Sequence, residues 1–117
     1  MKIISLYYDR YKTATTSKCL HDIKEQHTIL CHNNKDKFEN IYGELIQTNE
    51  PKGIQNNFNY GLSLLENDEW GLFMSDDYKE SYKLDKTKTK FEKCGLDYII
   101  DKVKQTIELA DKVGVKL

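Results

Sequence analysis

The 117-residue sequence has few of the residues that cross-link a chain or interrupt it, with three cysteines and one proline. Cys19, Cys31 and Cys94 are an odd number without C-x-x-C spacing, and a disulfide scaffold or a zinc knuckle would need more. We expect them to be reduced thiols in a cytoplasm. The single proline, Pro51, marks a firm break between elements.

The sequence also lacks a long apolar run and an excess of one charge. No apolar stretch approaches the roughly 18 residues that span a bilayer. The first one, residues 3–8, is followed directly by Asp9 and Arg10, unlike a signal peptide. Lys plus Arg total 18 against 19 for Asp plus Glu, so the global positive field that drives nonspecific nucleic-acid binding is missing. We expect a soluble cytoplasmic protein that does not bind membranes.

One local exception to the balanced charge is a basic run in the second half of the sequence. Such runs are most often solvated loops, and the alternative is a flexible cover over a phosphate. The run consists of Lys83, Lys86, Lys88, Lys90 and Lys93.

With 38% hydrophobic and 32% charged residues, the composition is typical of a globular domain, and we expect one domain over residues 1–117. Short apolar runs predict four strands, near residues 2–8, 27–31, 44–48 and 69–74. Helical patterns lie between or after them, around Cys19 to Ile23, at 54–66 and at 94–113. Strands that alternate with helices predict an α/β fold with a mainly parallel sheet and helices on both faces.

The last two helices have predicted apolar faces. In the helix that begins at Ile54, the apolar face comprises Ile54, Phe58, Leu62 and Leu65. The last helix presents about seven apolar residues from Leu96 to Val113, and residues 115–117 look like the start of another strand. We expect this helix to pack on its own sheet with residues 115–117 as an edge strand, or to form a homo-oligomer.

The most informative feature is an acidic pair, Asp76 and Asp77, directly after the predicted strand 69–74. In doubly wound sheets, ligands bind outside the carboxyl ends of the strands, where the strand order reverses. Two carboxylates there can hold Mg²⁺ or Mn²⁺, which neutralises a diphosphate. The structural alternative is a turn or a helix cap.

Further candidates lie near the same predicted edge. Arg10, the only arginine, could pair with a phosphate or with the acidic pair. Tyr7 and Tyr8 could stack on a base, although core packing explains at least one tyrosine there more simply. Asn59 could bond a base or a ribose, or lie on a polar helix face.

Two histidines flank the end of the first predicted helix. We expect His21 and His27 to be surface residues.

Three segments in this order resemble the TET-associated glycosyltransferases and, more broadly, family-2-like transferases of the GT-A fold, many of the former encoded by bacteriophages. The segments are LYYDRYKTATT (6–16), GIQNNFNYGL (53–62) and EWGLFMSDD (69–77). Two positions depart from the family pattern. Phe58 stands where an Arg is expected, and Ser75 replaces the first acid of an Asp-x-Asp motif.

The resemblance implies the Rossmann-like, nucleotide-binding half of a GT-A fold, without the C-terminal acceptor half and its catalytic base. It implies a nucleotide-sugar donor, bound through Mn²⁺ or Mg²⁺, and an acceptor such as modified phage DNA in the host cytoplasm. Asp77 would be the stronger metal ligand and Asp76 the supporting one. The implied nucleotide-binding residues are Tyr7, Tyr8, Arg10, Asn59 and Asp76. The alternatives are a non-catalytic nucleotide-binding remnant and a protein-interaction module.

Overall fold

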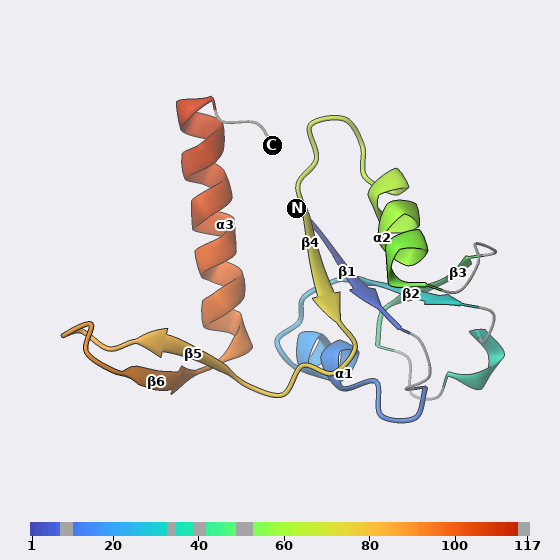
Figure 1. Cartoon of the computed structure of the whole chain (residues 1–117), viewed down its shortest axis with the longest axis horizontal. Coiled ribbons are helices and arrows are strands. Elements are labelled where there is room, and N and C mark those ends of the chain that lie inside the picture. Colours follow the sequence, from blue (N-terminus) through green and yellow to red (C-terminus); the bar gives the residue numbers. More distant parts are fainter. Residues whose placement is uncertain (8–10, 33–34, 39–41, 49–52, 115–117) are drawn as a thin grey trace. The chain divides into compact units, whose positions relative to one another are not determined.

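The computed structural model describes residues 1–7, 11–32, 35–38, 42–48 and 53–114 (Figure 1). They form two compact units, Met1–Lys79 and Glu80–Leu117, which are described separately. The prediction of one domain stays a prediction. The first unit contains β1 (Lys2–Leu6), α1 (Thr15–Asp22), β2 (Thr28–His32), the short 3-10 helix η1 (Lys35–Lys37), β3 (Glu44–Thr48), α2 (Ile54–Ser63) and β4 (Gly71–Ser75). The second contains β5 (Ser81–Leu84), β6 (Phe91–Cys94) and α3 (Leu96–Val113).

No helix within these described ranges has the length and apolar character required to cross a bilayer.

Four strands of the first unit form a parallel sheet in the order β3-β2-β1-β4. All four strands were predicted, and β3 has the predicted bounds. The parallel sheet is therefore confirmed. Apolar runs without strict alternation are typical of parallel strands, since helices cover both faces.

The two helices of the first unit pack on opposite faces of this sheet (Figure 1). Tyr7 continues β1 by donating its backbone N–H to Leu30 O at 2.8 Å, and its hydroxyl bonds to Ser17 of α1. Leu6 therefore points to the other face, where it belongs to the cluster that Tyr60 of α2 packs against. Because right-handed crossovers that run in opposite directions place their helices on opposite faces, the strand order accounts for this arrangement.

Each face has its own apolar cluster. On the α1 face, the Tyr7 and Phe38 rings meet edge to face with centroids 5.5 Å apart. The buried members there are Tyr7, Ala14, Ile29, Cys31 and Phe38. On the α2 face the buried members are Ile4, Leu6 and Leu30, flanked by Ile46, Tyr60, Leu65 and Phe73.

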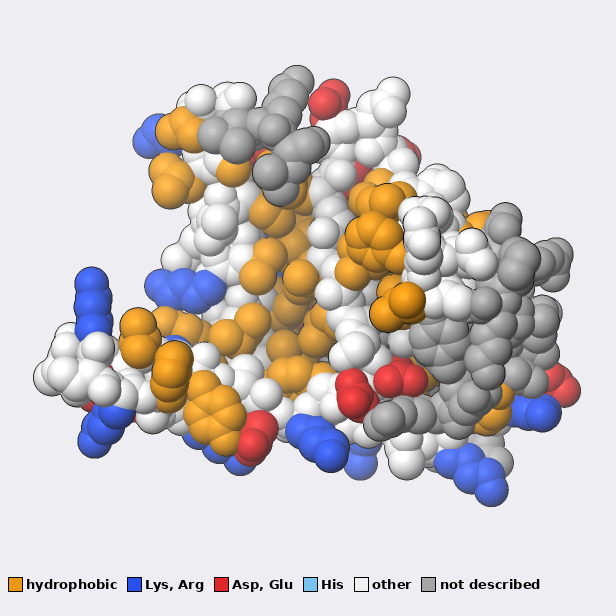
Figure 2. Space-filling view, in the orientation of Figure 1, with side chains coloured by type: hydrophobic (Ala, Val, Ile, Leu, Met, Phe, Trp, Pro, Cys, Tyr) orange, Lys and Arg blue, Asp and Glu red, His pale blue; other side chains and the backbone are white. Residues whose placement is uncertain are grey.

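The predicted apolar face of α2 is only partly buried. The Phe58 and Phe73 ring centroids lie 4.6 Å apart, and Leu65 packs against the cluster on this face. Ile54, Phe58 and Leu62 are 71%, 39% and 45% exposed, and hydrophobic side chains gather over α2 in Figure 2. Asn57 and Gly61 face inward instead. The physical reason is Gly61, where a Cβ atom would lie 2.6 Å from the Phe73 ring, so only glycine allows this close approach.

In the second unit, the lysine-rich segment forms the antiparallel hairpin β5–β6 and not the predicted loop. The tip lysines Lys86, Lys88 and Lys90 are exposed, so the expectation of solvated side chains is confirmed. The long helix was predicted at 94–113 and is α3, closed by Gly114 at a φ of 77°. The predicted edge strand at 115–117 lies outside the described residues.

Candidate functional site

The acidic pair lies where the strand order of the sheet reverses. The connection from β1 leads to β2 on one side, whereas β4 pairs with β1 on the other. Leu6 and Ser75 are register partners, so β1 and β4 end side by side. Asp76 and Asp77 therefore leave the sheet at its carboxyl edge, where doubly wound sheets bind ligands.

Thr16, a buried residue in the first turn of α1, holds this edge together. Its hydroxyl donates to the carbonyl oxygen of Ser75 at 2.6 Å and accepts the backbone N–H of Tyr78 at 2.9 Å. These two bonds bracket the acidic pair. The turn that carries both carboxylates is thus fixed to the amino terminus of a helix.

The two carboxylates have different surroundings. Asp77 is exposed, and its Oδ1 accepts a hydrogen bond from the Ser75 hydroxyl at 2.9 Å. Asp76 is half-buried, and its charge acts on the Tyr7 hydroxyl. The Ser75 hydroxyl therefore orients the second carboxylate of the pair.

Tyr7 is a core residue with 0% exposure. Its hydroxyl donates to Ser17 Oγ at 3.1 Å and accepts the Ser17 N–H at 3.0 Å. Desolvation, opposed by these bonds and reinforced by the Asp76 charge, raises the pKa of Tyr7. The buried ring has no face open to a base, which is the core-packing alternative that the sequence left open for one tyrosine.

Of the other predicted nucleotide-binding residues, the structure describes only Asn59. Tyr8 and Arg10 lie outside the described residues. Asn59 is exposed on α2. Its neighbour Asn57 is fully buried, with neither side-chain polar atom hydrogen-bonded.

No cluster of three or more His, Cys, Asp or Glu side chains suited to a metal ion occurs among the residues that the structure places. Asp76 and Asp77 are the acidic side chains that the described chain would offer to a cation at this edge.

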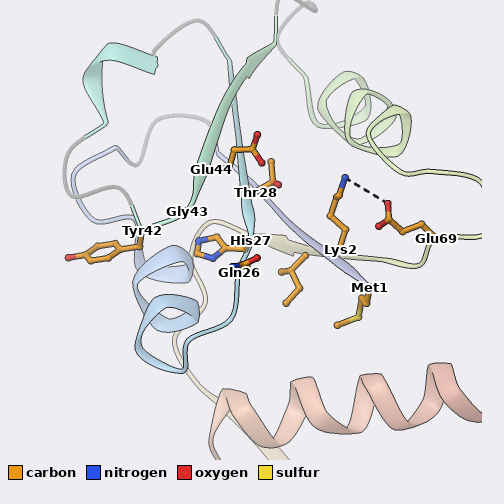
Figure 3. A pocket seen from close by; sticks show the side chains of 10 residues that line it. Met1, Lys2, Gln26, His27, Thr28, Tyr42, Gly43, Glu44 and Glu69 are labelled. Carbon is orange, nitrogen blue, oxygen red and sulfur yellow. Dashed lines mark ion pairs between the residues drawn. The ribbon is translucent and has the colours of Figure 1, made fainter.

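The opposite, amino edge of the sheet contains a cavity of about 370 Å³ (Figure 3). It is lined by residues at or just before the starts of the four strands: Met1, Lys2, Ile3, Gln26, His27, Thr28, Tyr42, Gly43, Glu44 and Glu69. Lys2 Nζ lies 3.8 Å from Glu69 Oε1 across its rim. This cavity has no counterpart in the sequence-based interpretation.

His27 is the main correction at this edge, because it is only 6% exposed and not a surface residue. Its Nδ1 lies 3.1 Å from the Glu25 carbonyl oxygen, whereas its Nε2 is buried without a hydrogen-bond partner. Burial lowers the pKa of His27. The physical reason for burial is Gly43, whose lack of a side chain lets β3 begin directly against the ring. A glycine just before a predicted strand is the one sequence signal for such a close approach.

No family model matches the chain. Comparison with curated proteins and with solved structures likewise finds no significant relative.

Proposed function

We propose that the chain binds the nucleoside diphosphate part of a nucleotide-sugar at the carboxyl edge between β1 and β4. The observation that carries the proposal is the position of Asp76 and Asp77, directly after the strand at which the sheet order reverses. Ligands of open α/β sheets bind in the crevice at this reversal. The resemblance of residues 6–16, 53–62 and 69–77 to GT-A transferases supports a nucleotide-sugar as the ligand.

The donor atoms at this edge fit a hard divalent cation such as Mg²⁺ or Mn²⁺. Mg²⁺ usually keeps several waters and is bound by one or two carboxylates together with substrate phosphates. Asp76 and Asp77 supply that number, and the Ser75 hydroxyl holds one Asp77 oxygen at 2.9 Å. The set therefore suits a cation that arrives with a diphosphate better than one held by protein alone.

The start of α1 adds a second attraction for an anion. The N-cap residue Ala14 has no side chain that caps this terminus. The Ser17 N–H is already taken by the Tyr7 hydroxyl, and Thr16 ties the first turn to the backbone on both sides of the acidic pair. The partial positive charge at a helix amino terminus favours phosphate oxygens. Ligand phosphates between the cation and α1 would thus meet positive potential on two sides.

Binding is the core of the proposal, and transfer of the sugar to an acceptor hydroxyl is its extension. A bound cation would stabilise the departing diphosphate electrostatically. The described residues identify no catalytic base, so a nucleotide-binding module without turnover is the second candidate. Assays of donor hydrolysis and of sugar transfer with a panel of nucleotide-sugars distinguish the two.

Calorimetry with UDP, with and without Mn²⁺, tests binding. We expect heat that depends on Mn²⁺, and we expect Asp77→Asn to weaken binding roughly 10-fold or more, with a smaller loss for Asp76→Asn. Asp101→Asn, which removes an exposed carboxylate from α3, is the matched control and should bind like the wild type. No heat from the wild type, or equal and negligible effects of both substitutions, would contradict the site.

A further inference from the structure

The hairpin β5–β6 has two unlike faces. Tyr82 and Lys93 are register partners, as are Leu84 and Phe91, and opposite residues of an antiparallel pair share a face. Lys83 belongs to the other face, where its Nζ lies 4.5 Å from the centre of the Tyr98 ring of α3. The hairpin thus presents one face to α3 and carries Tyr82, Leu84, Phe91 and Lys93 on the other, which we call the outer face.

The outer face exposes three large hydrophobic side chains. Tyr82 is 49%, Leu84 51% and Phe91 72% exposed. Figure 2 shows hydrophobic side chains in a row along the hairpin, with lysine side chains near them. Single exposed hydrophobic residues are normal, but neighbouring ones that include two aromatic rings indicate a binding surface.

The tip of the hairpin is a fixed basic turn. The Asp85 carboxylate accepts the Thr87 hydroxyl at 2.9 Å and the Thr89 N–H at 3.0 Å, and Lys88 adopts a left-handed φ of 57°. The turn therefore holds its three exposed lysines, Lys86, Lys88 and Lys90, in one short ordered segment.

These three lysines carry charge that the described protein does not neutralise. Lys83 pairs with Glu92 at 3.7 Å, and Lys93 pairs with Glu80 at 3.8 Å. In contrast, the tip lysines make no ion pair with any described residue. Residues 81–94 contain five lysines and two acids, a net charge of +3, although the whole chain has a net charge of −1.

We propose that the outer face of the hairpin binds single-stranded nucleic acid. Tyr82 and Phe91 would stack on unpaired bases, while the tip lysines Lys86, Lys88 and Lys90 would contact the phosphates. Aromatic platforms beside a basic track are how proteins bind single strands without sequence preference. The positive charge is confined to the hairpin, and the whole chain is nearly neutral. We therefore expect modest affinity and no long-range electrostatic steering of the nucleic acid.

The arrangement of side chains favours a nucleic acid over an anionic membrane. A membrane-inserting hairpin would place apolar residues at its protruding tip, but this tip consists of Lys, Thr and Asp residues. The apolar side chains lie on the strands, beside the Lys93–Glu80 ion pair. A polar, basic tip with the aromatic rings set back on the strands therefore fits phosphates and unpaired bases better than the interior of a bilayer.

Fluorescence anisotropy of a labelled oligothymidylate, titrated with the full chain, tests the proposal. We expect binding whose logarithm falls with the logarithm of salt concentration at a slope of about −2, since three lysines each contribute about 0.7. The triple variant Lys86→Gln, Lys88→Gln, Lys90→Gln should lose most of this slope. Tyr82→Ala and Phe91→Ala should each weaken binding about 10-fold and leave the slope unchanged.

A matched control carries the same charge change on α3, in the triple variant Lys102→Gln, Lys104→Gln, Lys112→Gln. It should bind as the wild type does. Circular dichroism checks that each variant is folded, and every substituted residue of the hairpin is exposed.

Four outcomes would overturn the proposal. The first is no anisotropy change at low salt, and the second is an equal loss of affinity in the hairpin and α3 triple lysine variants. The third is duplex binding as tight as single-strand binding, with no effect of the aromatic substitutions. The fourth is binding to phosphatidylserine vesicles without binding to the oligonucleotide. UDP binding at Asp76 and Asp77 is measured separately, so failure of either proposal leaves the other standing.

Discussion

The two edges of the parallel sheet are built from the same four strands, yet they are held in different ways. At the carboxyl edge, Thr16 forms hydrogen bonds on both sides of the acidic pair. At the amino edge, the Gly43 backbone lies directly against His27, whose Nε2 has no partner. Hydrogen bonds from Thr16 therefore hold the acidic pair at the first edge, whereas close packing of Gly43 against His27 is the distinctive contact of the second.

The difference predicts which substitutions each edge tolerates. A surface held by hydrogen bonds should be sensitive to the loss of a polar atom and tolerant of a small change in volume. A tightly fitted surface should respond in the opposite way. Three predictions test this contrast, from the largest expected effect to the smallest.

The largest effect is expected for Gly43→Ala at the amino edge. The new Cβ would lie 2.7 Å from the His27 carbonyl oxygen and 2.8 Å from its Nε2. Because one of these atoms is backbone, rotation of a side chain cannot relieve the clash, and we expect a loss of about 3 kcal/mol in the free energy of unfolding. Urea denaturation followed by circular dichroism measures it.

Gly71→Ala is the matched control for this substitution. Its new Cβ would meet the Leu65 side-chain tip at 2.8 Å, and that tip can rotate away. We expect a loss under about 1 kcal/mol. Equal losses in the two variants would show that the amino edge is not held by steric fit at Gly43.

A smaller effect is expected for Thr16→Val at the carboxyl edge. Valine keeps the shape but removes the bonds to Ser75 O and Tyr78 N, which should cost about 2 kcal/mol of unfolding free energy. Thr106→Val, which removes one exposed bond on α3, should change stability by less than about 0.5 kcal/mol. A Thr16→Val protein as stable as the wild type would contradict the role of hydrogen bonding at this edge.

The strands of the sheet could be predicted from the sequence because each is a short apolar run between polar segments. The orientation of α2 could not. Periodicity favoured a buried face through Ile54, Phe58 and Leu62, whereas the helix turns Gly61 toward Phe73. Close backbone packing at a glycine depends on the opposite strand, which no helical pattern contains.

The hairpin β5–β6 shows a second limit of sequence reasoning. Its strands have only four residues each, and its turn contains neither Gly nor Pro. The Asp85 side chain closes the turn instead. Without the usual turn residues, the alternation of Tyr82 and Leu84 is too short to stand out among lysines.

The sequence allowed the position of the candidate site to be predicted, but not the hydrogen bonds that hold it in place. Asp76 and Asp77 follow a recognisable strand, so their place at the carboxyl edge could be expected. The bonds from Thr16 could not, because they join residues separated by 59 and 62 positions. Gly43, just before a predicted strand, signals a close approach, but no sequence pattern identifies His27 as the residue that it lies against.

The smallest effect is expected from the pH dependence of His27. Burial lowers its pKa in the folded chain, opposed by the bond to the Glu25 carbonyl and reinforced by the charge of His21. The unfolded chain has the ordinary pKa of about 6.5, so below that pH it binds a proton that the folded chain resists. The contribution of His27 to stability is therefore complete above about pH 6.5 and is lost as the pH falls toward the lowered pKa.

Urea unfolding at about pH 7.5 and about pH 5.5 should show this loss of stability in the wild type. The variant His27→Gln should reduce the loss because the titrating group is gone. His21→Gln should retain most of the loss, since its charge is the weakest cause of the shift. An identical pH dependence of stability in the wild type and in His27→Gln would show that other groups cause it. The burial of His27 would then have no titration effect, and only the close packing at Gly43 would distinguish the amino edge.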